Sequence, residues 1–103
     1  QAQKINTLNQ YTLSNAAQID LEEILDFSIY QFGESQAESY FRELIQMIKV
    51  LADQPNLGRD RPELLNDLKS FTHKSHNIYY SINTAGIFIE RVLHQSRDLK
   101  NLF

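Results

Sequence analysis

The stretch "IFIERVLH", residues 87–94, decides the fold of this chain. It is rich in β-branched residues, and it is apolar on both faces except at Glu90 and Arg91. A strand that is apolar on both sides usually lies in the middle of a sheet, because each of its faces packs against another layer. We therefore expect residues 87–94 to form a central strand, with the rest of the chain arranged around it.

Three more segments are expected to join this strand in a sheet. Residues 76–83, "HNIYYSIN", show the period of two that is typical of a strand, with Ile78, Tyr80 and Ile82 alternating with Asn77, Tyr79 and Ser81. The four-residue turn "NTAG", residues 83–86, ends in glycine and joins the two strands. The segments "LKSFTHK" (68–74) and "QYTLS" (10–14) are also β-prone.

The region between residues 15 and 54 reads as two helices. Apolar residues recur at three- and four-residue spacing over residues 15–32, and a cleaner apolar stripe runs from Ala37 to Ala52. Gly33 is expected to end the first helix, a capping box of Ser35 and Glu38 to begin the second, and Pro55 to follow its end. The very short linker predicts an antiparallel helical hairpin.

The predicted fold class is α+β, in the order β-α-α-β-β-β, with a small, mainly antiparallel sheet and the helical hairpin packed on one face. Residues 10–103 are expected to form a single domain. Residues 1–9 are expected to be an N-terminal extension that is disordered or foreign to the natural chain, since residue 1 is not Met. One sheet face then has no cover, and Tyr79 or Tyr80, Arg91 and His94 would make it a contact surface.

The composition excludes several classes of site. The 103 residues include no cysteine, so disulfides and cysteine-ligated zinc are excluded. The three histidines match no metal-ligand spacing, and we expect neither a metal nor a cofactor. No apolar run approaches the roughly 20 residues of a membrane helix. We therefore expect a cytoplasmic protein that makes no membrane contact.

Charge is distributed unevenly along the chain. Residues 1–56 carry three basic and eight acidic side chains, a net charge of -5, and residues 57–103 carry seven basic and five acidic ones, a net charge of +2. An anionic partner should meet the second half first, but +2 is too small a charge for strong binding to a phosphate backbone.

Three ordered stretches resemble the ParE family of bacterial toxins. "ERVLHQSRDL" (90–99) is similar to the family's R-V-L-H-x-x-R-D ending, and "LADQPNLGRDRPELLNDLKSF" (51–71) resembles its loop and following strand. "QYTLSNAAQIDLEEILDFSIYQFGESQAESYFREL" (10–44) resembles its opening strand and helix pair. The chain departs from the family at Lys69, where arginine is common, and at residues 72–74, where Pro-x-Gly is common.

The resemblance implies a toxin of the RelE/ParE superfamily in a type II toxin–antitoxin system. ParE members inhibit DNA gyrase without being enzymes, and such systems stabilise plasmids or genomes. A cognate ParD-like antitoxin would bind the toxin directly in a hetero-oligomer and wrap it with a flexible tail. Operator DNA would be bound only through the antitoxin.

The alternative is a RelE-like ribosome-dependent mRNA endoribonuclease. Such an enzyme needs a base or acid and clustered cations, and docking on the ribosome favours a strongly basic protein. The sequence pI is about 5.5. The groups available for the chemistry are Lys69, His73, Lys74, His94, Arg97 and Lys100. A His–Arg–Tyr set could perform it, so the enzyme stays open as the second reading.

Five residues are candidates for binding the target: Arg59, Arg61, Arg91, His94 and Arg97. Each also has a structural reading. Arg91, on a central strand, is expected to form a buried or half-buried ion pair with Glu90 or Asp98, and His94 to pack at a strand end. Arg59 and Arg61 lie in a Pro-Gly loop, where arginines are usually solvated.

The candidates for binding the antitoxin are Phe27, Tyr30, Met47, Val50 and Tyr79. Met and aromatic residues outside the main helix stripes favour adaptable interfaces, although a wide core face would also explain them. We expect antitoxin contacts over residues 15–54 and over the strands between residues 69 and 94. The acidic first half should favour a tail that carries Lys or Arg.

Overall fold

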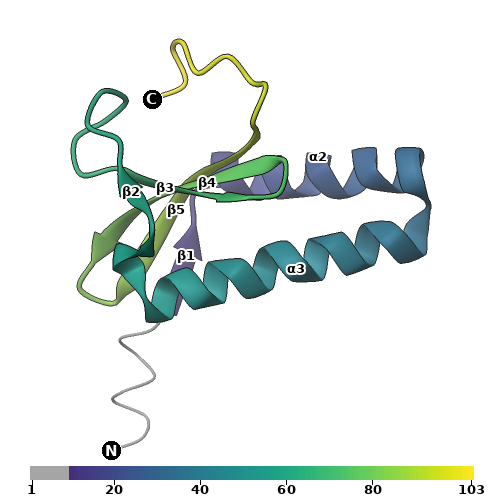
Figure 1. Cartoon of the computed structure of the whole chain (residues 1–103), viewed down its shortest axis with the longest axis horizontal. Helices are drawn as coiled ribbons and strands as arrows, with labels where there is room; N and C mark the ends of the chain where they lie inside the picture. The colour runs from purple at the N-terminus through teal and green to yellow at the C-terminus, as the bar shows by residue number, and fades with distance from the viewer. Residues whose placement is uncertain (1–9) are drawn as a thin grey trace, which may run out of the picture.

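The strand β5 (Gly86–His94) lies inside the sheet, between two neighbours, as the sequence predicts, although the middle position of the five strands is taken by β4 (His76–Asn83). Strand β5 pairs in parallel with β1 (Gln10–Leu13) and antiparallel with β4. Beyond β4 lie β3 (Lys69–His73) and the two-residue strand β2 (Arg59–Asp60), both antiparallel to their neighbours. The computed structural model describes residues 10–103, so the predicted N-terminal extension lies outside the described residues. The predicted α+β class is confirmed (Figure 1).

The helices α2 (Asn15–Phe32) and α3 (Glu34–Asp53) form the predicted antiparallel hairpin, joined by Gly33 alone (Figure 1). Ser14 caps α2, because its side-chain oxygen accepts a hydrogen bond from the Ala17 N–H at 2.9 Å. The predicted capping box is wrong. Ser35 lies inside α3, whose N-cap is Gly33 with no side-chain bond. Gly33 has φ +86°, a conformation that favours glycine and lets the chain reverse in one residue.

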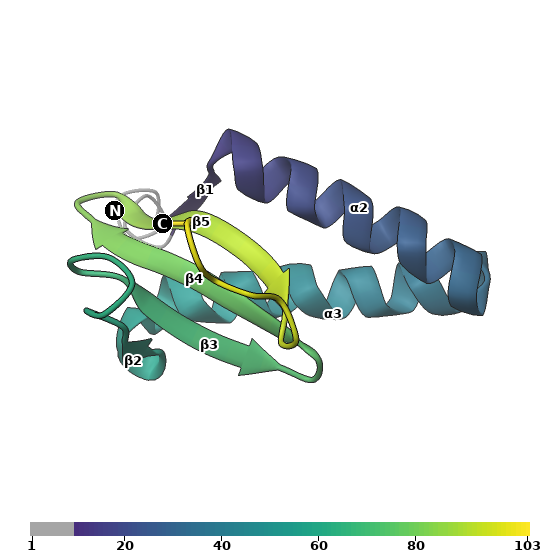
Figure 2. The same ribbon diagram turned by 90° about the horizontal axis from the view of Figure 1, so that it is seen from above.

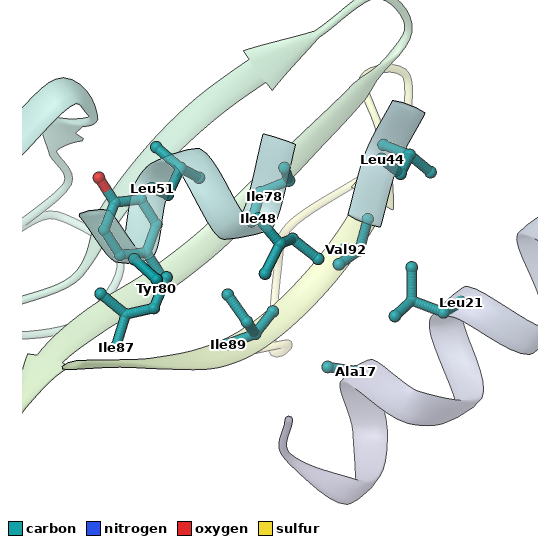
Figure 3. Packing of buried hydrophobic residues seen from close by; sticks show 11 residues of the cluster. Ala17, Leu21, Leu44, Ile48, Leu51, Ile78, Tyr80, Ile87, Ile89 and Val92 are labelled. Atoms are coloured by element: carbon teal, nitrogen blue, oxygen red, sulfur yellow. The ribbon is translucent and has the colours of Figure 1, made fainter. Parts of the chain in front are cut away.

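One hydrophobic cluster joins the hairpin to the sheet (Figure 3). In Figure 3, side chains of α2 and α3 point toward β4 and β5. Burial of these side chains is the main contribution to the stability of the two-layer arrangement. The labelled members are Ala17, Leu21, Leu44, Ile48, Leu51, Ile78, Tyr80, Ile87, Ile89 and Val92.

The opposite face of the sheet is covered, which corrects the prediction that nothing in the chain covers it. After β5 the chain turns back over the sheet on the side away from α3 (Figures 1 and 2). Tyr79 and Leu93 are buried there with Leu68, and Leu99, Leu102 and Phe103 of the tail pack against them. The rings of Tyr79 and Phe103 lie 5.0 Å apart between centroids. The tail and the loop after β2 therefore make a second, smaller core.

A β-bulge in β5 explains why this strand is apolar on both faces. Tyr79 lies opposite Arg91 and Tyr80 lies opposite Ile89, so Glu90 is an extra residue without a partner on β4. The extra residue reverses the alternation. Ile89 before the bulge and Val92 after it both join the cluster under the helices.

Asp20 of α2 supplies hydrogen-bond acceptors to the part of the β5 edge that lies beyond the end of β1. Its Oδ2 accepts hydrogen bonds from Arg91 Nε at 2.8 Å and from the Val92 N–H at 3.0 Å, and its Oδ1 accepts one from Arg91 Nη2 at 2.9 Å. The Asp20 side chain is only 5% exposed. The predicted ion pair of Arg91 is therefore present, but the predicted partners, Glu90 and Asp98, are wrong.

A second set of polar contacts holds α3 against β3 and β4. The Tyr40 hydroxyl and His76 Nδ1 are hydrogen-bonded at 2.6 Å. Glu43 Oε1 pairs with His73 Nε2 at 3.1 Å and with Lys74 Nζ at 2.9 Å. Burial lowers the pKa of His76 to about 4, and the nearby His94 and His73 add to this effect. His76 is therefore neutral at pH 7.

Replacing Arg91 should destabilise the fold. We expect Arg91→Ala to lower the free energy of unfolding by about 3 kcal/mol, because it leaves the buried Asp20 carboxylate without its charge partner. Arg97→Ala, at an exposed position, is the control and should change it by no more than about 0.5 kcal/mol. Urea unfolding followed by circular dichroism measures both. Equal stability of the two variants would show that the Asp20–Arg91 pair does not hold the fold together.

Stability should fall as the pH is lowered from 6.5 toward 4. The pKa of His76 is lowered in the folded chain, so the unfolded chain binds the proton more readily and protonation favours unfolding. For a half-buried group we expect about 1–2 kcal/mol of this loss after allowing for solvent screening. His76→Asn should remove that part of the pH dependence in thermal melts between pH 7 and 4. The lowered pKa values of Glu43 and Glu63 act in both proteins, and parallel profiles would contradict the assignment to His76.

Candidate functional site

A groove of 720 Å³ opens between the helical hairpin and the ends of β4 and β5. The hairpin extends beyond the end of the sheet at which β5 finishes (Figure 2). One wall of the groove is apolar and is formed by Ile24, Phe27 and Phe32 of α2, with Val92 of β5 beside it. The groove therefore offers an apolar surface in a concave site, which is the usual form of a binding site for another molecule.

The other side of the groove is polar. It is formed by Tyr40 from α3, Lys74 and Ser75 from the turn between β3 and β4, and the ends of β4 and β5, with Ser96 and Arg97 from the tail. The two imidazoles that line it, His76 and His94, meet edge to face with their centroids 5.4 Å apart. His94 Nδ1 accepts a hydrogen bond from the Ser96 N–H at 3.1 Å. Because Nδ1 accepts this bond, it carries no proton, and in neutral His94 the proton is on Nε2.

The cations of this polar side differ in their surroundings. The carboxylate of Glu43 pairs with the Lys74 ammonium, which raises the pKa of Lys74 and lowers that of Glu43. Burial raises the pKa of the Tyr40 hydroxyl. The exposed Arg97 guanidinium has no ion-pair partner within residues 10–103.

α2 displays a second apolar surface besides the one that packs in the core. Ala17, Leu21 and Ser28 are buried, while four large apolar residues on the same helix are exposed to solvent. A helix that is apolar on more than one side usually packs against something on each of those sides. The exposed fractions are 53% for Ile19, 60% for Phe27, 86% for Tyr30 and 58% for Phe32.

The five predicted antitoxin-binding residues fall into three environments. Phe27 and Tyr30 are exposed on α2. Met47 and Val50 are half-buried on α3, and Met47 packs against the main core, which favours the alternative reading of a wide core face. Tyr79 is 1% exposed and lies beneath the tail, so the expectation that it lies on an open sheet face is wrong.

The five predicted target-binding residues are not brought together. Arg59 and Arg61 lie at one end of the sheet, where β2 pairs with the start of β3, and His94 lies opposite His76 at the other end. Arg97 is beside His94 at the groove, whereas the guanidinium of Arg91 is held by Asp20. The arrangement therefore contains two separate candidate surfaces.

The loop that carries Arg59 is fixed to the sheet by a buried hydroxyl. Tyr80 donates a hydrogen bond to the Pro55 carbonyl at 2.7 Å and accepts one from the Gly58 N–H at 2.9 Å. A Cβ atom at Gly58 would lie 2.4 Å from the Tyr80 hydroxyl oxygen, so only glycine fits. Arg59 is exposed, while Arg61 is paired with Glu63 and bonded to Ser70.

Sequence reasoning missed several residues that shape the groove. An acidic residue in the early turns of a helix, such as Asp20, usually interacts with the helix dipole, yet Asp20 occupies a position of the buried face between Ala17 and Leu21. A polar residue in a core register was the signal that could have identified it. The contacts of Tyr40 with His76 and of Glu43 with Lys74 join elements over 30 residues apart, and no local pattern reveals them.

The residues that line the groove suit the binding of a peptide. Within residues 10–103, no group of three His, Cys, Asp or Glu side chains is placed to hold a metal ion. None of the helices that the structure describes has the length and apolar character to span a bilayer. The groove combines an apolar wall with a polar, partly cationic mouth, which suits an amphipathic peptide segment.

Comparison with known proteins agrees with this architecture. The family described as "ParE toxin of type II toxin-antitoxin system, parDE" matches residues 11–99. The chain is 39% identical over 92 residues to "Toxin ParE1" of Mycobacterium tuberculosis, covering 88% of this chain and 94% of that protein. It is 32% identical over 93 residues to "Toxin ParE1" of Caulobacter vibrioides, covering 90% and 96%.

A solved structure titled "Chromosomal ParDE TA system from P. aeruginosa" shares the fold, with a TM-score of 0.73 and 19% identity over 86% of this chain and 97% of that one. The sequence matches span nearly the whole length of both partners, and the family match includes β5 and the start of the tail, up to residue 99. The chain therefore belongs to the ParE toxin family of type II toxin–antitoxin systems.

Proposed function

We propose that this toxin inhibits DNA gyrase without being an enzyme, and that direct binding of a cognate antitoxin neutralises it. Membership of the ParE family supports the proposal. The observation that carries the choice of target is that three of the six groups available for RNA chemistry are already engaged by carboxylates of the same chain. We expect the toxin to act in the cytoplasm, where gyrase works.

The engaged cations are those that a ribonuclease would need to stabilise a phosphorane-like transition state. Lys69 pairs with Asp60 at 2.9 Å, and Lys74 pairs with Glu43. A guanidinium already paired with a carboxylate attracts an incoming phosphate less strongly, and Arg61 is in this position with Glu63. The net charge of -3 further disfavours docking on ribosomal RNA.

The sheet face away from the helices also disfavours the RelE-like alternative. An RNA-cleaving site needs open access for a nucleotide, and this face is filled by Leu99, Leu102 and Phe103. The imidazole of His76 is neutral at pH 7, so it is a poor proton donor there. A toxin that acts by binding a protein needs neither an open nucleotide site nor a proton donor.

The antitoxin would cover the groove and the exposed side of α2. Four large apolar side chains stand exposed on this helix, and Phe27 and Phe32 among them line the groove. A disordered tail that folds on binding can bury both surfaces at once. The solved structure of similar fold is titled as a ParDE toxin–antitoxin system, which supports an antitoxin partner for this chain.

Paired assays test the target. We expect the purified toxin to block supercoiling by DNA gyrase and to leave messenger RNA intact in a cell-free translation reaction. Arg59→Ala should weaken the effect on gyrase several-fold if the loop after α3 touches the target, because Arg59 is exposed on a loop that Tyr80 holds in place. Lys49→Ala, exposed on α3, is the control. Cleaved messenger RNA with unaffected gyrase would reverse the proposal.

Hydrogen exchange with and without the antitoxin tests the neutralising surface. We expect added protection in α2, in α3 and in the strands between residues 69 and 94, because a wrapping tail would shield their backbone amides. A protein with the same tag but no antitoxin tail serves as the control. Protection confined to residues 59–63 would place the interface elsewhere.

A further inference from the structure

We propose that the antitoxin segment in the groove carries a carboxylate next to its apolar side chains, and that this carboxylate pairs with Arg97 on the polar side of the groove. The inference rests on the proposed antitoxin binding and adds the charge pattern and direction of the bound segment. It assigns Arg97 to antitoxin recognition, where the sequence suggested a role in target binding.

The apolar part of the pattern follows from the α2 wall. Phe27 and Phe32 are more than half exposed, and both line the groove together with Ile24. Apolar side chains of a partner would bury these rings, and the free energy gained grows with the apolar area removed from water. The groove therefore takes an amphipathic segment, not a polar one.

The acidic part follows from the opposite side. Arg97 is exposed there and has no carboxylate partner within residues 10–103, whereas Lys74, which lines the same groove, is already paired with Glu43. Nε2 of His94 supplies a further donor, because its Nδ1 is occupied by Ser96. One carboxylate placed among these donors would form charge-assisted hydrogen bonds in a partly enclosed site.

The two sides of the groove carry opposite charge, which gives the bound segment a direction. Glu23 lines the α2 side, and Glu22 and Asp26 are exposed on the same helix. Asp20 adds no free negative charge, because Arg91 neutralises it. A segment with Lys or Arg near α2 and Asp or Glu near Arg97 fits this polarity, whereas the reversed segment places like charges together.

Binding of the purified toxin to its operon-encoded antitoxin, measured by isothermal titration, tests the inference. We expect Arg97→Glu to weaken binding about tenfold, equivalent to 1.4 kcal/mol, and to flatten the salt dependence of the affinity. Arg59→Glu makes the same charge change at an exposed site at the other end of the sheet, outside the groove and outside the expected antitoxin surface, and should bind as the wild type does. Thermal melts of both variants check that each is folded.

A charge swap makes the test specific. Replacing each acidic residue of the antitoxin tail in turn by Lys should identify one variant that binds wild-type toxin weakly and recovers affinity for Arg97→Glu. Recovered affinity would support a direct ion pair between Arg97 and that acidic residue of the antitoxin. Equal binding by Arg97→Glu and Arg59→Glu, with tight wild-type binding, would overturn the inference and leave the proposed antitoxin binding intact.

Two further outcomes also count against the inference. If the antitoxin fails to bind wild-type toxin at all, the proposed neutralisation itself fails. If sedimentation shows that the toxin alone forms a dimer that Arg97→Glu disrupts, the groove holds a second copy of the chain, and the carboxylate belongs to that copy.

Discussion

The carboxylate of Asp20 joins the helical hairpin to the sheet, and the other parts of the structure rely on this contact. It accepts hydrogen bonds from the Arg91 guanidinium and from the Val92 N–H, which lies on an edge of β5 that β1 is too short to cover. A helix thus completes the hydrogen bonding of a strand 71 residues away. Because α2 is fixed to β5 at this point, the two elements stay apart beyond it, and the groove lies between them.

The bulge at Glu90 connects the same strand to both cores. It allows Ile89 and Val92 to face the helices, while Leu93 faces the tail. Without the bulge, the residues after Glu90 would face the opposite sides of the sheet. Their apolar side chains would then point away from the cores in which they pack. The tail then closes the second face with Leu99, Leu102 and Phe103. The large apolar side chains that stay exposed therefore lie mainly on α2 and at the groove, not on this sheet face.

This distribution of surfaces fits a protein that acts by binding. Three of the six groups that could serve catalysis are paired within the chain, and the large exposed side chains are apolar and lie mainly on one helix. Such a surface is costly to leave in water, and a partner that folds onto it gains the corresponding hydrophobic free energy. The opposite charges on the two sides of the groove would select the direction in which that partner lies.

The sequence by itself determined both helices, four of the five strands, their order and the family resemblance, and it missed β2, because Arg59 and Asp60 lie in a Pro-Gly loop. Local periodicity placed the helix over residues 15–32 and the strand over residues 76–83, because side-chain spacing and end signals act within a few residues. It also identified Arg91 as half of an ion pair and Phe27 and Tyr30 as exposed. The tertiary structure alone decided the partner of Arg91, the cover over Tyr79 and the placing of Arg97 beside Lys74. These features join residues far apart in the chain, and they depend on the bulge and on the direction of the tail, which no local pattern encodes.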